Sequence, residues 1–181
     1  MIDFWNKRMK LGILTENPEQ DESLKKIEKE IRDTVKKKFA GSLAIRMVDS
    51  GSCNACEAEC NALSNPYYDL ERLGIYFVAS PRHADVMLLS GLMTFNMSPH
   101  VLDAYRQMPE PKWVITLGDC PVMQAPFERT FAIKAPAESH LPVAHHIPGC
   151  PPEPKEIIEG LLAFLRKINY SSPNSFIQDT Q

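Results

Sequence analysis

The chain has 181 residues, of which 44% are hydrophobic and 24% charged, and its formal net charge is −3 at pH 7. This length suits one compact domain with an appended segment, and the negative charge argues against a general nucleic-acid binder. The sequence contains no run of about 18 apolar residues, so we expect no bilayer-spanning helix. The N-terminus lacks the apolar core of a signal peptide. We therefore expect a cytoplasmic protein whose five cysteines are reduced and serve metal or redox chemistry rather than disulfides.

Residues 1–41 form a predicted N-terminal arm. Apolar residues recur at helical spacing from Leu24 to Phe39, with lysines and arginines between them, so we expect an amphipathic helix that begins near residues 21–23 and ends before Gly41. Such a helix would lie on the body of the protein or on a partner. An aromatic and basic cluster further upstream, which includes Trp5, would also suit contact with anionic lipid headgroups.

Residues 42–168 form the predicted body, in which short apolar strands alternate with helices, and residues 169–181 form a C-terminal tail. The predicted strands are Leu43–Val48, Ile75–Val78, Asp85–Leu89, Trp113–Leu117 and Val143–Ile147. The predicted helices are Cys56–Leu63, Pro99–Met108 and Glu153–Ile168. The third strand is almost continuously apolar, as expected where both faces of a parallel sheet are covered. This order of elements predicts an open, mainly parallel α/β sheet.

Four of the cysteines follow the ends of predicted strands. Cys53 and Cys56 follow the first strand, Cys120 the fourth and Cys150 the fifth. In open α/β sheets ligands bind beyond the carboxyl ends of the strands, so we expect these thiols at one edge. Four thiolates suit a [4Fe–4S] cluster or a tetrahedral zinc ion. A structural zinc site usually takes its second pair of ligands from another closely spaced motif, so the isolated third and fourth cysteines favour a cluster.

The fifth cysteine, Cys60, lies about one helical turn beyond Cys56. It could place a further thiol on the same helical face, but its position better suits a small buried hydrophobic side chain. A nucleophilic cysteine–histidine pair is another alternative, yet nothing in the sequence singles out one cysteine with one histidine. Glu57 and Glu59 lie beside the predicted ligands, where they would lower the potential of a cluster or stabilise the start of a helix.

Four segments together resemble one family of electron-transfer subunits. They are DSGSCNACEAE (49–59), SPRHADVMLLSG (80–91), MPEPKWVI (108–115) and IPGCPP (147–152). In order and spacing they are similar to the small subunit of membrane-bound, energy-converting [NiFe] hydrogenases, including formate hydrogenlyase. The same family contains the cluster-bearing B subunit of NADH:quinone oxidoreductase (complex I). The resemblance covers about residues 43–165 of the chain.

This resemblance implies a flavodoxin-like open sheet with helices on both faces, and one [4Fe–4S] cluster on Cys53, Cys56, Cys120 and Cys150. It implies a peripheral subunit on the cytoplasmic side of the cell membrane, within an oxidoreductase, and no complete active site in this chain. The implied partners are a large catalytic subunit of the hydrogenase or complex I type, a ferredoxin-like cluster subunit and integral membrane subunits.

Two features bear on the branch within this family. Quinone-oxidoreductase subunits carry adjacent cysteines at the first motif, whereas two residues separate Cys53 from Cys56, as in the hydrogenase branch. After Cys120 the sequence departs from the Gly-rich turn that is usual in the family. A complex that reduces a quinone or a sulfur compound therefore stays open as an alternative. A metal-stabilised interaction module without redox turnover is an alternative of another class.

Overall fold

The computed structural model describes residues 2–12, 22–123 and 130–168. Within them a five-stranded sheet has the strand order β2-β1-β3-β4-β5, and every pairing is parallel. The strands are β1 (Leu43–Asp49), β2 (Ile75–Phe77), β3 (Val86–Ser90), β4 (Trp113–Leu117) and β5 (Val143–Ile147). This is the flavodoxin-like order of a doubly wound sheet, with a switch point between β1 and β3. The predicted fold class is confirmed.

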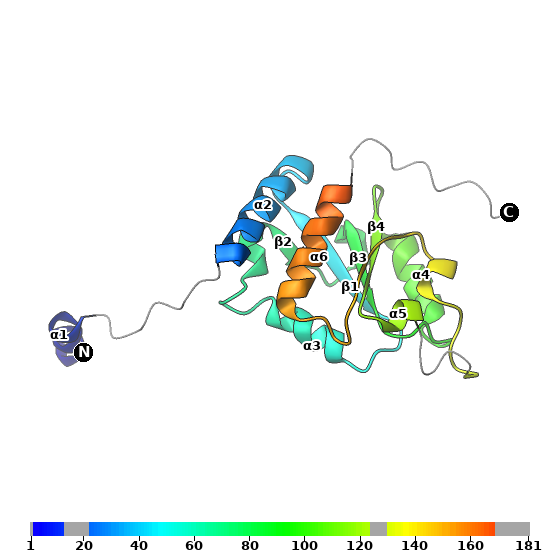
Figure 1. Ribbon diagram of the computed structural model, residues 1–181, viewed down its shortest axis with the longest axis horizontal. Helices are drawn as coiled ribbons and strands as arrows, with labels where there is room; N and C mark the ends of the chain where they lie inside the picture. The colour runs from blue at the N-terminus through cyan, green and yellow to red at the C-terminus, as the bar shows by residue number, and fades with distance from the viewer. Residues whose placement is uncertain (1, 13–21, 124–129, 169–181) are drawn as a thin grey trace.

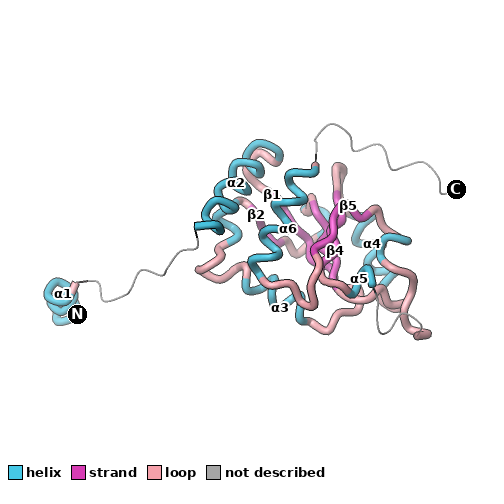
Figure 2. The backbone as a smooth tube through the Cα atoms, in the orientation of Figure 1, coloured by secondary structure: helices cyan, strands magenta, loops and turns pink. Residues whose placement is uncertain are grey.

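Helices cover both faces of the sheet (Figure 1; Figure 2). Residues of α2 (Glu22–Lys38), α3 (Ala55–Ala62) and α6 (Pro154–Lys167) lie in the core on one face, and Val101 of α4 (Ser98–Gln107) lies in the core on the other. The remaining helices are α1 (Ile2–Leu11) and α5 (Cys120–Met123), and 3-10 turns lie at Leu70–Leu73, Pro81–His83 and Ala137–Ser139. None of the helices within the described ranges is both long and apolar enough to cross a membrane.

The central strand β3 explains why two hydrophobic cores form. All five of its residues are buried. Because successive side chains of a strand point to opposite faces, Val86 and Leu88 join the core under α2, α3 and α6, whereas Met87 and Leu89 join the core under α4. The nearly continuous apolar run predicted that helices cover this strand on both faces, and the structure confirms that prediction.

The helix α2, which falls in the predicted arm, packs on the body of the protein. Its buried side chains Leu24, Ile31 and Val35 lie in the same core as α6. Arg166 of α6 donates two hydrogen bonds of 2.6 Å to the two carboxylate oxygens of Glu30. The amphipathic pattern was compatible with a helix that lies on the body of the protein or on a partner. The structure shows α2 on the body.

Elements too short to produce a periodic pattern account for most differences from the prediction. The four-residue α5 and the 3-10 turns were not predicted, and neither was the antiparallel bridge between Thr94 and Ile133. The upstream aromatic and basic cluster lies on α1, where Trp5 is exposed. The predicted C-terminal tail lies outside the described residues.

The docking of α2 leads to a stability prediction. Ile31 is 0% exposed, so Ile31→Ala should leave a cavity and lower the free energy of unfolding by about 2–5 kcal/mol. Urea unfolding followed by circular dichroism measures this change. Lys29→Ala, at an exposed position of the same helix, is the control and should stay within about 0.5 kcal/mol of the parent chain. Equal unfolding midpoints for both variants would contradict a role of α2 in the core.

Candidate functional site

The carboxyl edge of the sheet brings together the four cysteines that were predicted as ligands. Cys53 lies in the loop after β1 and Cys56 in the first turn of α3. Cys120 begins α5 just after β4, and Cys150 follows β5. Cys53 and Cys150 are exposed, whereas Cys56 and Cys120 are half-buried.

Electrostatic interactions indicate that these thiols lie in one region. Burial raises the pKa of Cys56 to about 12, and the charges of Glu57, Cys120, Cys53 and Cys150 add to the rise. Burial is also the main cause that raises the pKa of Cys120, followed by the charges of Cys150 and Cys53. Cysteines from three different strand ends therefore lie in one another's electrostatic field.

A reciprocal pair of hydrogen bonds joins the loops after β4 and β5. The Asp119 N–H donates to the Gly149 carbonyl at 2.9 Å, and the Gly149 N–H donates to Oδ1 of Asp119 at 2.9 Å. Each of these residues immediately precedes a predicted ligand, Cys120 in one loop and Cys150 in the other. The pair thus holds two of the four cysteine positions side by side.

Gly118 makes room for the thiol of Cys56. A Cβ at this position would lie 2.7 Å from the Cys56 Sγ, and the φ of Gly118 is +78°. A side chain here would therefore meet both a close contact and a backbone conformation that L-residues rarely adopt. The Cys56 Sγ also lies 3.9 Å from the Leu117 carbonyl oxygen. The absence of a side chain at Gly118 lets α3 place its thiol directly against the loop after β4.

Cys60 lies in the core, as its helical position suggested. It is 2% exposed and packs among the apolar residues beneath α2, α3 and α6. Burial raises its pKa to about 12, and Cys56 is the only other cysteine whose charge contributes. The thiol of Cys60 is therefore separate from the group formed by Cys53, Cys120 and Cys150.

The half-buried carboxylate of Glu57 lies at the switch point between β1 and β3. Oε1 of Glu57 accepts a hydrogen bond from the hydroxyl of Ser90, the last residue of β3. Oε2 of Glu57 is buried and has no hydrogen-bond partner among the described residues. Glu57 was predicted to lie beside the ligands, whereas Ser90 was not predicted. The one signal for Ser90 in the sequence is a hydroxyl residue at the end of an apolar strand.

The chemistry of the four thiols bears on the kind of metal group that would suit them. Within the described ranges, no three His, Cys, Asp or Glu side chains form a group that could hold a metal ion. Deprotonated cysteine thiols are the ligands of tetrahedral zinc sites and of iron–sulfur clusters. The donor set at this edge of the sheet therefore suits either group.

Known proteins are similar to this chain in sequence and in fold. The family model described as NADH ubiquinone oxidoreductase, 20 Kd subunit, matches residues 53–164. The chain is 40% identical over 156 residues to the probable membrane-bound hydrogenase subunit mbhJ of Pyrococcus furiosus, which covers 86% of this chain and 90% of that protein.

Two solved structures are also similar. One is a chain of the membrane-bound sulfane sulfur reductase, an archaeal respiratory membrane complex, with 28% identity and a TM-score of 0.62 over 76% of this chain and 74% of that chain. The other, in the NAD⁺-reducing [NiFe]-hydrogenase, shares the fold, with 16% identity and a TM-score of 0.53 over 67% of this chain and 92% of that chain.

The family match begins at Cys53 and ends within α6, so it contains all four cysteines of the carboxyl edge. The long match to a hydrogenase subunit extends the similarity to most of the chain. The relatives just described are subunits of oxidoreductases. This chain belongs to the same family, that of the 20 kDa subunit of NADH ubiquinone oxidoreductase.

Proposed function

We propose that this chain is an electron-transfer subunit of a membrane-bound hydrogenase complex, and that it holds one [4Fe–4S] cluster next to the active site of a large partner subunit. The cluster ligands would be Cys53, Cys56, Cys120 and Cys150. The observation that carries the proposal is the convergence of these thiols, from three strand ends, at one edge of the sheet. A bound cluster would supply one-electron redox chemistry.

The residues of this chain would fix the position of the cluster and set its electrostatic surroundings. Cys56 and Cys120 are half-buried and would hold its inner side, whereas the exposed Cys53 and Cys150 would hold the side that faces a partner. Glu57, half-buried next to Cys56, would add negative charge and disfavour the reduced, more negative state of the cluster.

We also propose where the chain sits and what it assembles with. Its relatives are subunits of membrane-bound complexes, so we place the chain at the cytoplasmic face of the membrane as a peripheral subunit. The partners would be the large catalytic subunit, a ferredoxin-like cluster subunit and integral membrane subunits. In this arrangement the integral subunits supply the anchoring.

A related complex with another substrate is the second candidate. The similarity to a chain of the sulfane sulfur reductase complex supports reduction of a sulfur compound, and complex I relatives would suggest a quinone. Assays of the purified complex with protons, sulfane sulfur and quinone separate these cases. Metal analysis that finds zinc without iron or sulfide would instead favour a metal-stabilised module without redox turnover.

The first prediction from the proposed function concerns ligation. Serine at Cys53, Cys56, Cys120 or Cys150, one at a time, should lose or convert the cluster, because each change removes one of four thiolates. Iron and sulfide content and electron paramagnetic resonance of anaerobically purified protein measure the loss. Cys60→Ser is the matched control and should keep its iron. Iron that survives Cys120→Ser but disappears in Cys60→Ser would make this assignment wrong.

The second prediction concerns thiol reactivity in the metal-free, reduced chain. Cys53 and Cys150 are exposed and should react with iodoacetamide first. Cys60 should react last, because it is buried and its pKa of about 12 leaves little of the reactive thiolate at neutral pH. Mass spectrometry of timed samples gives the order, and in denaturant all five cysteines should react alike. Labelling of Cys60 as fast as Cys150 would contradict its burial.

The third prediction concerns the membrane. A complex that lacks residues 1–20 should stay in the membrane fraction, since integral partners would anchor it. The basic residues of α1 would contribute only about 1 kcal/mol each near an anionic surface, and this attraction weakens as salt rises. Fractionation at low and high salt, with the full-length complex as the control, measures retention. Release of the assembled, truncated complex into the soluble fraction would make residues 1–20 the anchor.

A further inference from the structure

The short strand β2 leaves half of β1 unpaired on one side. The β1–β2 ladder ends at the pair Ile45 and Phe77, whereas the ladder between β1 and β3 continues to the pair Asp49 and Ser90. The Val78 N–H donates to the Ile45 carbonyl at 2.9 Å. Among the described residues, this is the last ladder bond on the β2 side of β1.

The alternation of backbone groups along β1 identifies which N–H and C=O groups lack a strand partner on the β2 side. In a strand, the N–H and C=O of alternate residues point to opposite neighbours. Ile45 points toward β2, since its carbonyl accepts from Val78, and Ser50 points toward β3, since its N–H donates to the Ser90 carbonyl at 2.9 Å. Met47 lies two residues beyond Ile45, so its N–H and C=O point to the side where β2 has ended.

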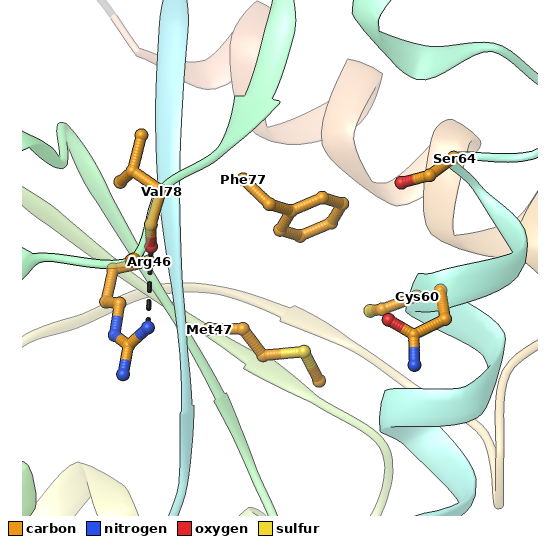
Figure 3. A pocket seen from close by; sticks show the side chains of 8 residues that line it. Arg46, Met47, Cys60, Ser64, Phe77 and Val78 are labelled. Atoms are coloured by element: carbon orange, nitrogen blue, oxygen red, sulfur yellow. Dashed lines mark hydrogen bonds between the residues drawn. The ribbon is translucent and has the colours of Figure 1, made fainter.

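A pocket of about 300 Å³ lies beside this open half of β1 (Figure 3). Met47 of β1 and Phe77 at the end of β2 extend toward Cys60 of α3 and form an apolar lining. Asn61 and Ser64, at the end of α3 and just after it, add polar groups and are exposed. The pocket therefore suits an apolar side chain that enters between a strand edge and a helix.

Arg46 adds a positive charge at the same place. Its Nη1 donates a long hydrogen bond of 3.4 Å to the Val78 carbonyl, and none of the ion pairs between described residues includes it. A half-buried guanidinium without a carboxylate partner is complementary to an acidic group, which it can bind through two parallel hydrogen bonds.

The opposite edge of the sheet shows how an edge is normally covered. At β5, Lys167 of α6 donates from Nζ to the Ala144 carbonyl at 2.9 Å. A charged side chain of this kind protects an edge strand from pairing with another chain. Beside the open half of β1, the described residues provide an apolar pocket and Arg46 instead.

We propose that an extended segment of a partner subunit adds to β1 at this edge, with an apolar side chain in the pocket and a carboxylate at Arg46. Strand addition gains affinity from main-chain hydrogen bonds and specificity from pockets for alternate side chains. Residues 46–49 offer about 13 Å of strand at about 3.3 Å per residue, enough for a short segment. The proposal goes beyond the proposed function, because it concerns assembly and requires no particular metal group.

The test uses the assembled complex and a photo-crosslinking amino acid. Benzoylphenylalanine replaces Ala79, which is exposed and lines the pocket, or Ala163, an exposed position of α6 that serves as the matched control. From Ala79 we expect adducts to one contiguous segment of a partner subunit that contains Asp or Glu. Ala163 should not label that segment. No adduct from Ala79, or adducts only within this chain or to a lipid-like small molecule, would overturn the proposal.

Amide hydrogen exchange provides a second, independent readout. The Met47 amide should exchange at least about tenfold more slowly in the complex than in the isolated full chain, because it gains a hydrogen-bond partner. The Leu43 amide already donates to the Gly74 carbonyl at 2.8 Å and should change little. Equal exchange of the Met47 amide in both samples would overturn strand addition.

Charge variants separate this proposal from the cluster proposal. Arg46→Glu should lower the yield of the Ala79 adduct several-fold, because it places two acidic groups together, and Arg46→Lys should retain much of it. Iron content should stay unchanged in both variants. An unchanged adduct yield in Arg46→Glu would remove the role of the carboxylate, whereas loss of iron in the Cys→Ser series bears only on the cluster.

Discussion

The common direction of the five parallel strands is the constraint on which the rest of the structure depends. Because every strand ends at the same edge, cysteines far apart in the sequence arrive in one place without any contact between their own segments. The strands keep this direction because the crossover helices bury both faces of β3, where Val86 and Leu88 face one layer and Met87 and Leu89 the other. The arrangement of the thiols therefore depends on the apolar packing of strands and helices, to which Cys56 adds its own contact with the core.

Within this frame, small local features place the individual sulfurs. The pair between Asp119 and Gly149 ties two loops together, and the missing side chain of Gly118 lets Cys56 approach them. Burial then raises the pKa values of Cys56 and Cys120, so these two thiols are protonated at neutral pH in the metal-free chain. A metal group that needs thiolates would have to displace these protons when it binds.

The sequence could predict the fold and the grouping of the cysteines because both follow from local patterns. Short segments bounded by Pro and Gly marked β4 and β5 with their observed bounds, and cysteines placed just after strands are expected at the edge. It could not predict that Ser90 bonds to Glu57, since that contact depends on how α3 packs over β3. It also could not predict α5, because four residues with a proline at the second position contain no helical period.

The early end of β2 illustrates how a small local difference can matter for assembly. The sequence predicted this strand through Val78, but it ends at Phe77 while β1 continues to Asp49. The pocket beside the open half of β1 is lined by Cys60 of α3, the helix that also carries Cys56, and β1 itself leads directly into the loop of Cys53. A segment that pairs with β1 would thus pack against both supports of the first cysteine pair. Docking at this edge would therefore hold α3 and the Cys53 loop in place, which links assembly to the geometry of the four thiols.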